Sequence, residues 1–374
     1  MDQTEETATD GEIEAIDRNL ARLATRRIAL AAESPAIDRA YERRVVSSAT
    51  EGATPEEETA LRQFFATVFG LSGARRRAKL RGEPPIMAKI REAARAAKPL
   101  PSRAVVACAG TEGSYSQEAA TLMFPMPTIL YFNGFEAVFE AVEKGLCPYG
   151  ILPVENSAAG SVAAVYDLMV RHRFHIVRAL RLKVSHVLLA PHGVRLEDVK
   201  EVSSHPHALA QCAAFLKAHP AMATTPATNT AAAAKELAAS GRHDMAVIAS
   251  RECAELYGLD VIAEGIADAA FNYTRFICIS KNLETTPDAG KFSIMLSLPH
   301  RPGALNSIIS KFAAIDVNLT KLESRPVPGM DFEFRFTFDF EAPPTDPAVL
   351  ALLSEIAQDP AIEHFTFLGA YAEK

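Results

Sequence analysis

The chain has 374 residues, too many for one compact core, and its 48% hydrophobic residues predict well-buried interiors in two or three domains. Its formal net charge of -7 is mild, with both signs spread along the sequence, which argues against a nucleic-acid or membrane-surface partner. The sequence has no apolar run long enough for a membrane span and no secretory signal behind its acidic start, so we expect a cytoplasmic protein.

Residues 1–98 are predicted to form an all-helical domain. Apolar residues within 13–30 recur at steps of three and four, the spacing of one helical face, and Arg27 lies on that face. A second long helix is expected after Thr54, because Thr54 and Glu57 have the spacing of a capping box.

The segment 96–103, with its two prolines, is the predicted linker to a domain that we place at 103–284. There, short β-rich apolar runs alternate with helical runs, which predicts an α/β fold with a mostly parallel sheet, divided into two lobes. The apolar runs are RAVVACAG, TILYF, YGILPV, HIVRAL, VSHVLLA, DMAVIAS, DVIAEGI and YTRFICIS. The expected helices span 115–123, 134–144, 161–171, 206–218 and 230–239.

Residues 290–374 are predicted to form a third domain. Its expected elements are strand 291–298, helix 303–314, strand 317–325, strand 331–340, helix 347–357 and strand 362–369. This βαββαβ order is the ferredoxin-like topology, so the whole chain is predicted to be a multidomain α/β protein.

In the middle domain, several apolar strands are followed by small or polar residues that begin a helix. These clusters lie at 110–116, 155–157, 204–206 and 229–230. Unpaired N–H groups and the positive end of the dipole make each helix start favourable for anions, so converging starts predict a pocket for a small carboxylate or phosphate. The glycine-rich segment matches neither GxGxxG nor a loop ending in GK[ST], so a nucleotide is not indicated. The five cysteines lie far apart without CxxC spacing, which predicts reduced core thiols and no metal site.

Four motifs resemble the prephenate dehydratase family in sequence, order and spacing. They are YGILPVENSAAGSVAAVYDLM (149–169), SSHPHALAQCAAFL (203–216), ASRECAELYGLDVI (249–262) and NYTRFICIS (272–280). The resemblance implies a two-lobed fold like that of periplasmic ligand-binding proteins. It also implies conversion of prephenate to phenylpyruvate, with loss of carbon dioxide and water, in phenylalanine biosynthesis, and no cofactor.

The resemblance places Thr274 at the catalytic position. A threonine hydroxyl is too weak an acid to surrender its proton near neutral pH, so we expect it to donate a hydrogen bond, or relay a proton, to the leaving hydroxyl. Glu155 is the candidate acid, because burial would raise its pKa, and Arg275 is expected to bind a carboxylate. The other expected substrate-binding residues, from the same motifs and clusters, are Phe276, Asn156, Ser157, Ser114, Ser116, Ser204, His205, Gln211 and Thr230.

The segment 301–326 resembles the phenylalanine-binding ACT domain attached to many dehydratases. The residues that this resemblance assigns to effector binding are Gly303, Ala304 and Leu305, then Glu323, Ser324 and Arg325. Such domains pair side by side, so the resemblance implies a homodimer or homotetramer that phenylalanine inhibits allosterically.

The N-terminal helices resemble the chorismate mutase domain of bifunctional enzymes, with Arg27 and Arg39 at family arginine positions. No arginine precedes Ile13, however, Ala40 occupies an acidic position, and Arg76 stands where a glutamine is expected. Mutase catalysis depends on electrostatic fixing of a dianion, so these departures favour a decayed mutase fold with a role in dimerisation over an active one.

Two other functions stay open at this stage. One is an arogenate dehydratase, whose substrate carries an amino group in place of the keto oxygen. The other is a binding protein that senses amino acids without catalysis. The triplet 274–276 beside Glu155 and Asn156 favours an enzyme over a sensor, although Thr274 alone is more typical of an ordinary strand start.

Overall fold

A computed structural model describes residues 3–34, 37–269, 271–327 and 333–374. The chain divides into two compact units. The first unit comprises Met1–Ala88, Leu298–Lys311 and Pro347–Glu363. The second unit comprises Lys89–Ser297, Phe312–Asp346 and His364–Lys374.

The first unit is built from helices. Its elements are α1 (Gln3–Glu33), α2 (Arg39–Ala49), α3 (Pro55–Arg81), the start of α4 (Pro85–Arg95), most of α12 (Ala304–Ala313), and α13 (Pro347–Gln358). The predicted capping box at the start of α3 is confirmed, because the backbone N–H of Thr54 donates to Glu57 Oε2 at 2.8 Å and Glu57 N–H donates to Thr54 Oγ1. The Gln358 amide donates to the Gly82 carbonyl at 2.9 Å and joins α13 to the end of α3.

The second unit contains the two predicted lobes. The first lobe has the strands β1 (Arg103–Ala109), β2 (Met126–Phe132), β3 (Tyr149–Asn156), β5 (His175–Lys183) and β11 (Tyr273–Ser280), in the order β5-β11-β3-β1-β2, with the short β4 (Gly160–Ser161) beside β3. Its helices are α5 (Tyr115–Met123), α6 (Phe135–Glu143) and α7 (Ala163–His172). Apolar side chains of β1 alternate between two buried clusters, with Ala107 in one and Val106 in the other, so both faces of this sheet are covered.

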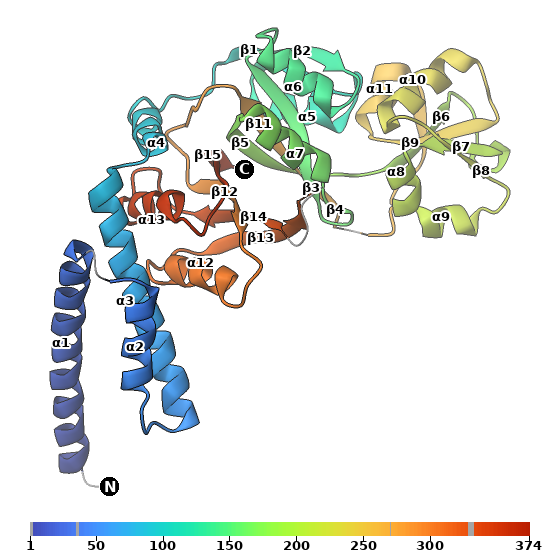
Figure 1. The fold of residues 1–374 in the computed structure, drawn as a ribbon. Coiled ribbons are helices and arrows are strands. Elements are labelled where there is room, and N and C mark those ends of the chain that lie inside the picture. The colour runs from blue at the N-terminus through green and yellow to red at the C-terminus, as the bar shows by residue number, and fades with distance from the viewer. Residues whose placement is uncertain (1–2, 35–36, 270, 328–332) are drawn as a thin grey trace. The chain divides into compact units, whose positions relative to one another are not determined.

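The second lobe has its own five-stranded sheet, in the order β10-β6-β9-β7-β8. Its strands are β6 (Val187–Pro191), β7 (Glu201–Ser204), β8 (Ala223–Pro226), β9 (Met245–Ala249) and β10 (Leu259–Ala263). Its helices are the 3-10 helix η1 (Leu196–Asp198), α8 (Pro206–Gln211), α9 (Ala213–Ala218), α10 (Thr230–Ser240) and α11 (Glu252–Tyr257). Figure 1 shows α10 and α11 on one side of this sheet and α8 and α9 on the other.

The sheets of both lobes are mostly parallel, as predicted, but each contains one antiparallel strand inserted between parallel ones, β11 in the first lobe and β6 in the second. The chain leaves the first lobe after β5 and returns from the second lobe at β11, which inserts between β3 and β5 and runs antiparallel to both. Two open α/β sheets joined by two crossing segments form the two-lobed architecture of periplasmic binding proteins. The helix expected at 206–218 is broken at Cys212 into α8 and α9.

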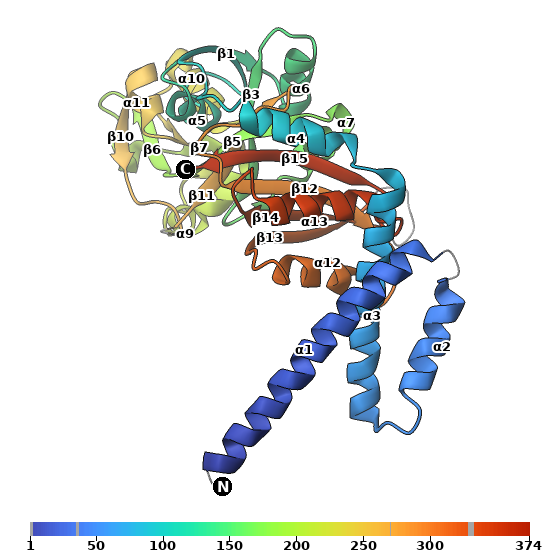
Figure 2. The ribbon, with the colours of Figure 1, turned by 90° about the vertical axis from the view of Figure 1, so that its left-hand side faces the viewer.

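The C-terminal strands are β12 (Lys291–Leu298), β13 (Leu319–Pro326), β14 (Phe334–Glu341) and β15 (Phe365–Glu373). Their order, β13-β14-β12-β15, is that of a ferredoxin-like sheet. Residues 331 and 332 of the predicted strand 331–340 lie outside the described residues. Strand β15 also pairs in parallel with β5, so the C-terminal strands and the first lobe share one sheet, and Figure 2 shows the part of this sheet from β13 to β5.

The five cysteines are buried free thiols, as predicted. Within the described ranges, no helix combines the length and apolarity needed to cross a membrane. Nor does this part of the chain bring together three or more side chains that are suited to holding a metal ion.

Candidate functional site

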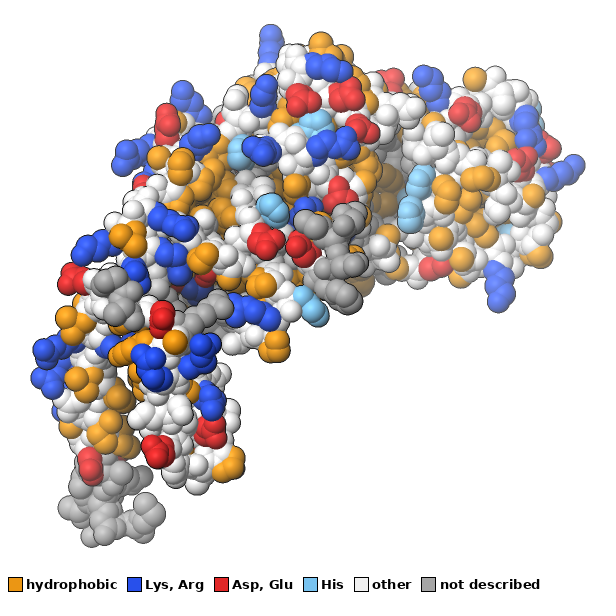
Figure 3. Space-filling model, in the orientation of Figure 1, with side chains coloured by type: hydrophobic (Ala, Val, Ile, Leu, Met, Phe, Trp, Pro, Cys, Tyr) orange, Lys and Arg blue, Asp and Glu red, His pale blue; other side chains and the backbone are white. Residues whose placement is uncertain are grey.

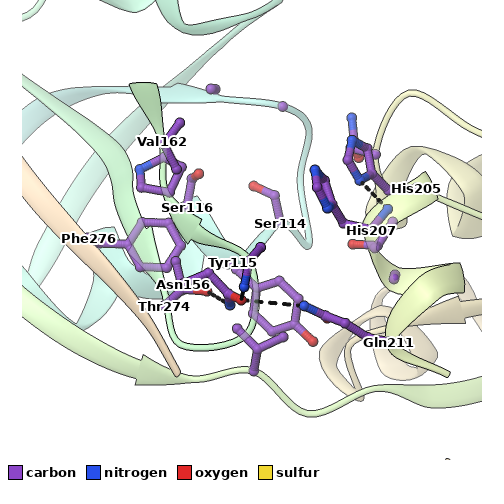
Figure 4. Close-up of a pocket in the computed structure, with 18 of the residues that line it drawn as sticks. Ser114, Tyr115, Ser116, Asn156, Val162, His205, His207, Gln211, Thr274 and Phe276 are labelled. Atoms are coloured by element: carbon purple, nitrogen blue, oxygen red, sulfur yellow. Dashed lines mark hydrogen bonds between the residues drawn. The ribbon is translucent and has the colours of Figure 1, made fainter. Parts of the chain in front are cut away.

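A cavity of about 540 Å³ lies between the two lobes of the second unit. Its volume is within the range of about 300 to 1,000 Å³ that is typical of small-molecule sites. The first lobe contributes Ser114, Tyr115, Ser116, Asn156, Val162, Thr274 and Phe276 to its walls, and the second lobe contributes His205, His207, Gln211, Asn229 and Thr230. Figure 3 shows the hollow between the lobes, and Figure 4 shows the lining side chains facing it.

The adjacent strands β3 and β11 place Asn156 opposite Thr274. Asn156 Nδ2 donates to Thr274 Oγ1 at 2.9 Å and to Asn272 Oδ1 at 2.8 Å. The orientation of the Asn156 amide is fixed because its Oδ1 accepts from the backbone N–H groups of Ala158 and Ala159, at 3.0 and 2.9 Å. Thr274 Oγ1 is therefore an acceptor toward Asn156, which leaves its own proton for an acceptor in the cavity.

A chain of amides links this pair to the second lobe. Gln211 Nε2 lies 3.5 Å from Asn156 Oδ1 (Figure 4). Gln211 Oε1 accepts from Asn272 Nδ2 at 3.0 Å. His186 Nε2 is also 3.0 Å from Gln211 Oε1, which requires a proton on that nitrogen. The Asn156 side chain is therefore held by residues of the first lobe, by Asn272 of the returning segment and by Gln211 of the second lobe, which His186 contacts in turn.

Burial favours the neutral form of two imidazoles of the site, those of His186 and His205. Burial lowers the pKa of His186, and burial followed by the neighbouring His207 lowers the pKa of His205. His205 Nδ1 accepts from the backbone N–H of His207 at 3.2 Å. Burial also raises the pKa of Tyr115 well above its usual range, so it stays a phenol, and its hydroxyl donates to the Ser185 carbonyl at 2.8 Å.

Two helices begin at the cavity. Ser114 caps α5 through Gln117 N–H, and Asn229 caps α10 through Ala232 N–H at 2.7 Å. The first backbone N–H groups of each helix have no intrahelical acceptor, and the dipole places positive charge there. Among the described lining residues there is no lysine, arginine, aspartate or glutamate. The polar groups that this cavity offers to a ligand are therefore helix starts, hydroxyls, amides and imidazoles.

The structure does not bring Arg275 or Glu155 into the cavity, which corrects their expected roles as carboxylate ligand and proton donor. Successive residues of a strand point to opposite faces, so Thr274 and Asn156 face the cavity while Arg275 and Glu155 face away from it. Arg275 forms an ion pair with Asp339 at 2.5 Å, and Glu155 forms one with Lys321 at 2.9 Å.

Two of the expected serines also lie outside the lining of the cavity. Ser204 is fully buried, and its hydroxyl donates to the Ile248 carbonyl at 2.5 Å, within the second-lobe sheet. The Ser157 hydroxyl accepts from the Tyr273 backbone N–H at 2.9 Å and stabilises the loop after β3. The other expected substrate-binding residues, namely Ser114, Ser116, Asn156, His205, Gln211, Thr230 and Phe276, line the cavity together with Thr274.

Three polar residues of the site were not expected from the sequence, namely His186 and His207 in the lining of the cavity and Asn272 behind Asn156. Tyr115 and Asn229 lie in the predicted polar clusters but were not assigned to substrate binding. Asn272 had a signal, because it lies two residues before Thr274 in the same motif. His186 had none, since it lies inside an apolar run and reaches the site only through the crossing segment between β5 and β6.

The expected effector residues fall into both compact units. Gly303 has a φ of +79°, a conformation that favours glycine, and it precedes Ala304 and Leu305 at the start of α12. On β13, Glu323 accepts from Ser161 Oγ at 2.5 Å and from Arg325 Nε at 2.8 Å, and Ser324 lies between them.

In the helical unit, Arg27 Nη1 donates to Ser72 Oγ on α3 at 2.8 Å, and the Arg27 guanidinium lies 4.6 Å from the centre of the Phe69 ring. Arg27 is thus held by a hydroxyl and an aromatic ring. The side chain of Arg39 lies outside the described part of the structure.

The sequence profile of the prephenate dehydratase family matches residues 106–284. A chloroplastic arogenate dehydratase/prephenate dehydratase of Arabidopsis thaliana is 39% identical over 288 residues, which cover 72% of this chain and 73% of that protein. The crystal structure of a prephenate dehydratase from Arthrobacter aurescens in complex with L-Phe is 32% identical, with a TM-score of 0.64 and coverage of 72% of this chain and 89% of that one. A structure described as a new type of quorum-quenching acylase is 29% identical, also with a TM-score of 0.64, and covers 72% of this chain and 98% of its own.

Proposed function

Because this chain belongs to the prephenate dehydratase family, we propose that it converts prephenate to phenylpyruvate in the cavity between the lobes. The observation that carries this proposal is the Asn156–Thr274 pair, which presents a hydroxyl proton to the cavity. Prephenate has a ring hydroxyl that leaves as water and a ring carboxylate that leaves as carbon dioxide. A fixed hydroxyl donor suits the first of these departures.

In the proposed reaction, the ring C–O bond breaks and its electron pair leaves with oxygen. The C–C bond to the ring carboxylate also breaks, and its pair completes the aromatic ring. The hydrogen bond from Thr274 stabilises the charge that develops on the leaving oxygen, and one proton from solvent completes the water. Phe276 and Val162 add an apolar surface to the wall of the cavity. An apolar surface favours neutral carbon dioxide over a charged carboxylate.

We assign the remaining carboxylate to the starts of α5 and α10, because Ser116 and Thr230 line the cavity there and the first N–H groups of a helix have no intrahelical acceptor. The composition of the lining supports prephenate over arogenate, because arogenate carries an ammonium group and the described lining residues include no carboxylate to pair with it.

The test is turnover of each substrate by the purified full-length chain. We expect release of phenylpyruvate from prephenate, with a kcat/KM at least about ten-fold above that for arogenate. A ten-fold ratio corresponds to a difference of about 1.4 kcal/mol in transition-state free energy, the size of one ion pair. A preference for arogenate would overturn the substrate assignment. Turnover of neither substrate would overturn the activity, and with it the reading of the Asn156–Thr274 pair as catalytic.

We further propose that phenylalanine inhibits the enzyme through the C-terminal region. The two ACT-like motifs support this, as does the L-Phe bound to the Arthrobacter aurescens relative. A coupling of about 1 to 3 kcal/mol corresponds to an increase of about 5- to 150-fold in the substrate concentration needed for half-maximal rate. The measurement is a prephenate titration at zero and at saturating phenylalanine, and superimposable curves would exclude this regulation.

For the N-terminal helices we propose a role in self-association without mutase activity. Five apolar residues on one face of α1, namely Ile13, Ile16, Leu20, Leu23 and Leu30, are between 46% and 59% exposed. Figure 3 shows hydrophobic side chains on the surface of these helices. A second copy of the same stripe is a chemically matched cover, and burying a leucine yields about 1.5 to 3 kcal/mol.

Replacing Leu20 with glutamate is expected to lower the mass of the assembly in sedimentation experiments, because a charge on the stripe opposes its burial. The matched control is Asn19→Glu, which adds the same charge at the neighbouring position and should leave the mass unchanged. Equal masses for wild type and Leu20→Glu would show that α1 is not part of an interface. Conversion of chorismate by the full-length chain at an enzymatic rate would contradict the loss of mutase activity.

A further inference from the structure

A buried group of polar and charged side chains lies on the face of β11 that is turned away from the cavity. We call it the Arg275 cluster, and its members are Arg275, Lys291, Ser293, Asp339, Tyr371 and Glu373. Apart from Arg275, all of them belong to the C-terminal strands β12, β14 and β15. The proposed reaction uses none of them.

Arg275 is the centre of this cluster. Its Nη1 lies 2.5 Å from Asp339 Oδ2, and its Nη2 donates to Tyr371 Oη at 2.7 Å. Its Nε lies 2.5 Å from Glu373 Oε1, an ion pair without hydrogen-bond alignment. The side chains of Arg275 and Asp339 are only 7% and 2% exposed. A buried arginine that loses its partner is strongly unfavourable, so Arg275 must stay with the C-terminal strands.

The register of the strands connects this cluster to the site. Arg275 follows Thr274 in β11, and Glu155 precedes Asn156 in β3. Glu155 pairs with Lys321 of β13 at 2.9 Å, so both members of the Thr274–Asn156 pair have a neighbour anchored to the C-terminal strands. The pairing of β11 with β3 shifts register immediately after Arg275, and such an irregularity locally redirects a strand. The direction in which Thr274 points therefore depends on what holds Arg275.

We infer that the Arg275 cluster is a positioning device that holds the Thr274 hydroxyl beside Asn156 and transmits displacements of the C-terminal strands to it. This inference rests on the proposed function. It assigns Arg275 and Asp339 a part in turnover although neither touches the cavity. It also supplies a route for the proposed effector, because Lys321 and the effector motif at Glu323 share strand β13.

The experiment compares Asp339→Asn with wild type in the full-length chain. The substitution keeps the shape of the side chain but removes the charge that orients Arg275. We expect kcat per folded molecule to fall at least ten-fold, KM for prephenate to stay within two-fold, and inhibition by phenylalanine to weaken in the same variant. The folded fraction is measured by circular dichroism, so loss of folded protein is separated from loss of rate.

The matched control is Asp288→Asn, which should leave kcat unchanged. Asp288 Oδ2 lies 3.1 Å from Nη2 of Arg178 on the adjacent strand β5, so this substitution also removes the acidic partner of an arginine. Tyr371→Phe is a second variant that keeps the core volume and removes one acceptor of Arg275. We expect it to lower kcat two- to five-fold, and it decides the question if Asp339→Asn does not fold.

A kcat within two-fold of wild type in the folded variants would show that the cluster is only structural. An equal fall in rate for Asp288→Asn would show the same. A wild-type enzyme without prephenate turnover would instead refute the proposed function, so the two failures are distinguishable. Loss of rate with unchanged phenylalanine sensitivity would keep the positioning role and overturn the transmission.

Discussion

Replacing Thr274 with alanine is expected to lower kcat for prephenate by about 100- to 10,000-fold, the usual contribution of a positioned proton donor. The substitution removes the one hydroxyl that Asn156 holds at 2.9 Å with its proton directed away from the amide. KM should change little, because the proposed carboxylate ligands lie at the starts of α5 and α10 and are untouched. The measurement is steady-state release of phenylpyruvate.

Folding should survive this change. Asn156 Nδ2 keeps its acceptor Asn272, and its Oδ1 keeps the N–H groups of Ala158 and Ala159, so no buried polar group loses every partner. Thr274→Ser is the matched control, since it retains the hydroxyl and removes only a methyl group, and it should keep most of the activity. A near-native kcat for Thr274→Ala would remove the hydroxyl from the mechanism. A Thr274→Ser variant as slow as the alanine variant would point to packing in place of proton donation.

The predictable parts of the site are those that depend on local chemistry. Ser114 and Asn229 are short polar residues directly before helical runs, and both cap helices that begin at the cavity. The pattern of strand, polar cluster and helix places such starts at one edge of a sheet. This local pattern was enough to predict a cavity between two lobes that helix starts line.

The sequence did not reveal which face of β11 meets the cavity. Residues 274–280 of β11 are all buried. One face of this strand meets the cavity and the first-lobe helices, and other elements pack against its opposite face. A strand buried on both faces shows no alternation of polar and apolar residues. The sequence therefore did not distinguish which of Thr274 and Arg275 faces a ligand. The true partners of Arg275 are 64 and 96 residues away, at Asp339 and Tyr371, in a region that was assigned to regulation alone.

The antiparallel insertion of β11 escaped prediction for a related reason. Alternating strands and helices usually indicate parallel crossovers, and nothing local distinguishes a strand that returns from a second lobe. The same holds for His186, which reaches Gln211 only because the crossing segment carries it there. Long-range placement of this kind is set by packing of the whole unit.

Replacing Asn156 with aspartate should also be severe, with kcat reduced by about 100- to 1,000-fold, the cost of losing a preorganised donor. One carboxylate oxygen would keep the Ala158 and Ala159 N–H groups, while the other would face Thr274 Oγ1 in place of Nδ2. Thr274 would then donate its proton to the carboxylate and have none for the substrate. The added negative charge would also raise KM, because prephenate is a dianion and the described lining offers no lysine or arginine to offset it.

The pH dependence of this variant gives the sharper test. Below the pKa of the introduced carboxyl group, that group is neutral and again donates a hydrogen bond, so relative to wild type the variant should gain activity as the pH falls. Asn282→Asp, at an exposed position outside the cavity, makes the same chemical change and should follow the wild-type profile. If the ratio of the Asn156→Asp rate to the wild-type rate were constant with pH, the amide would serve only to pack the site. If it rises toward acid, the direction of the Thr274 proton is what Asn156 controls.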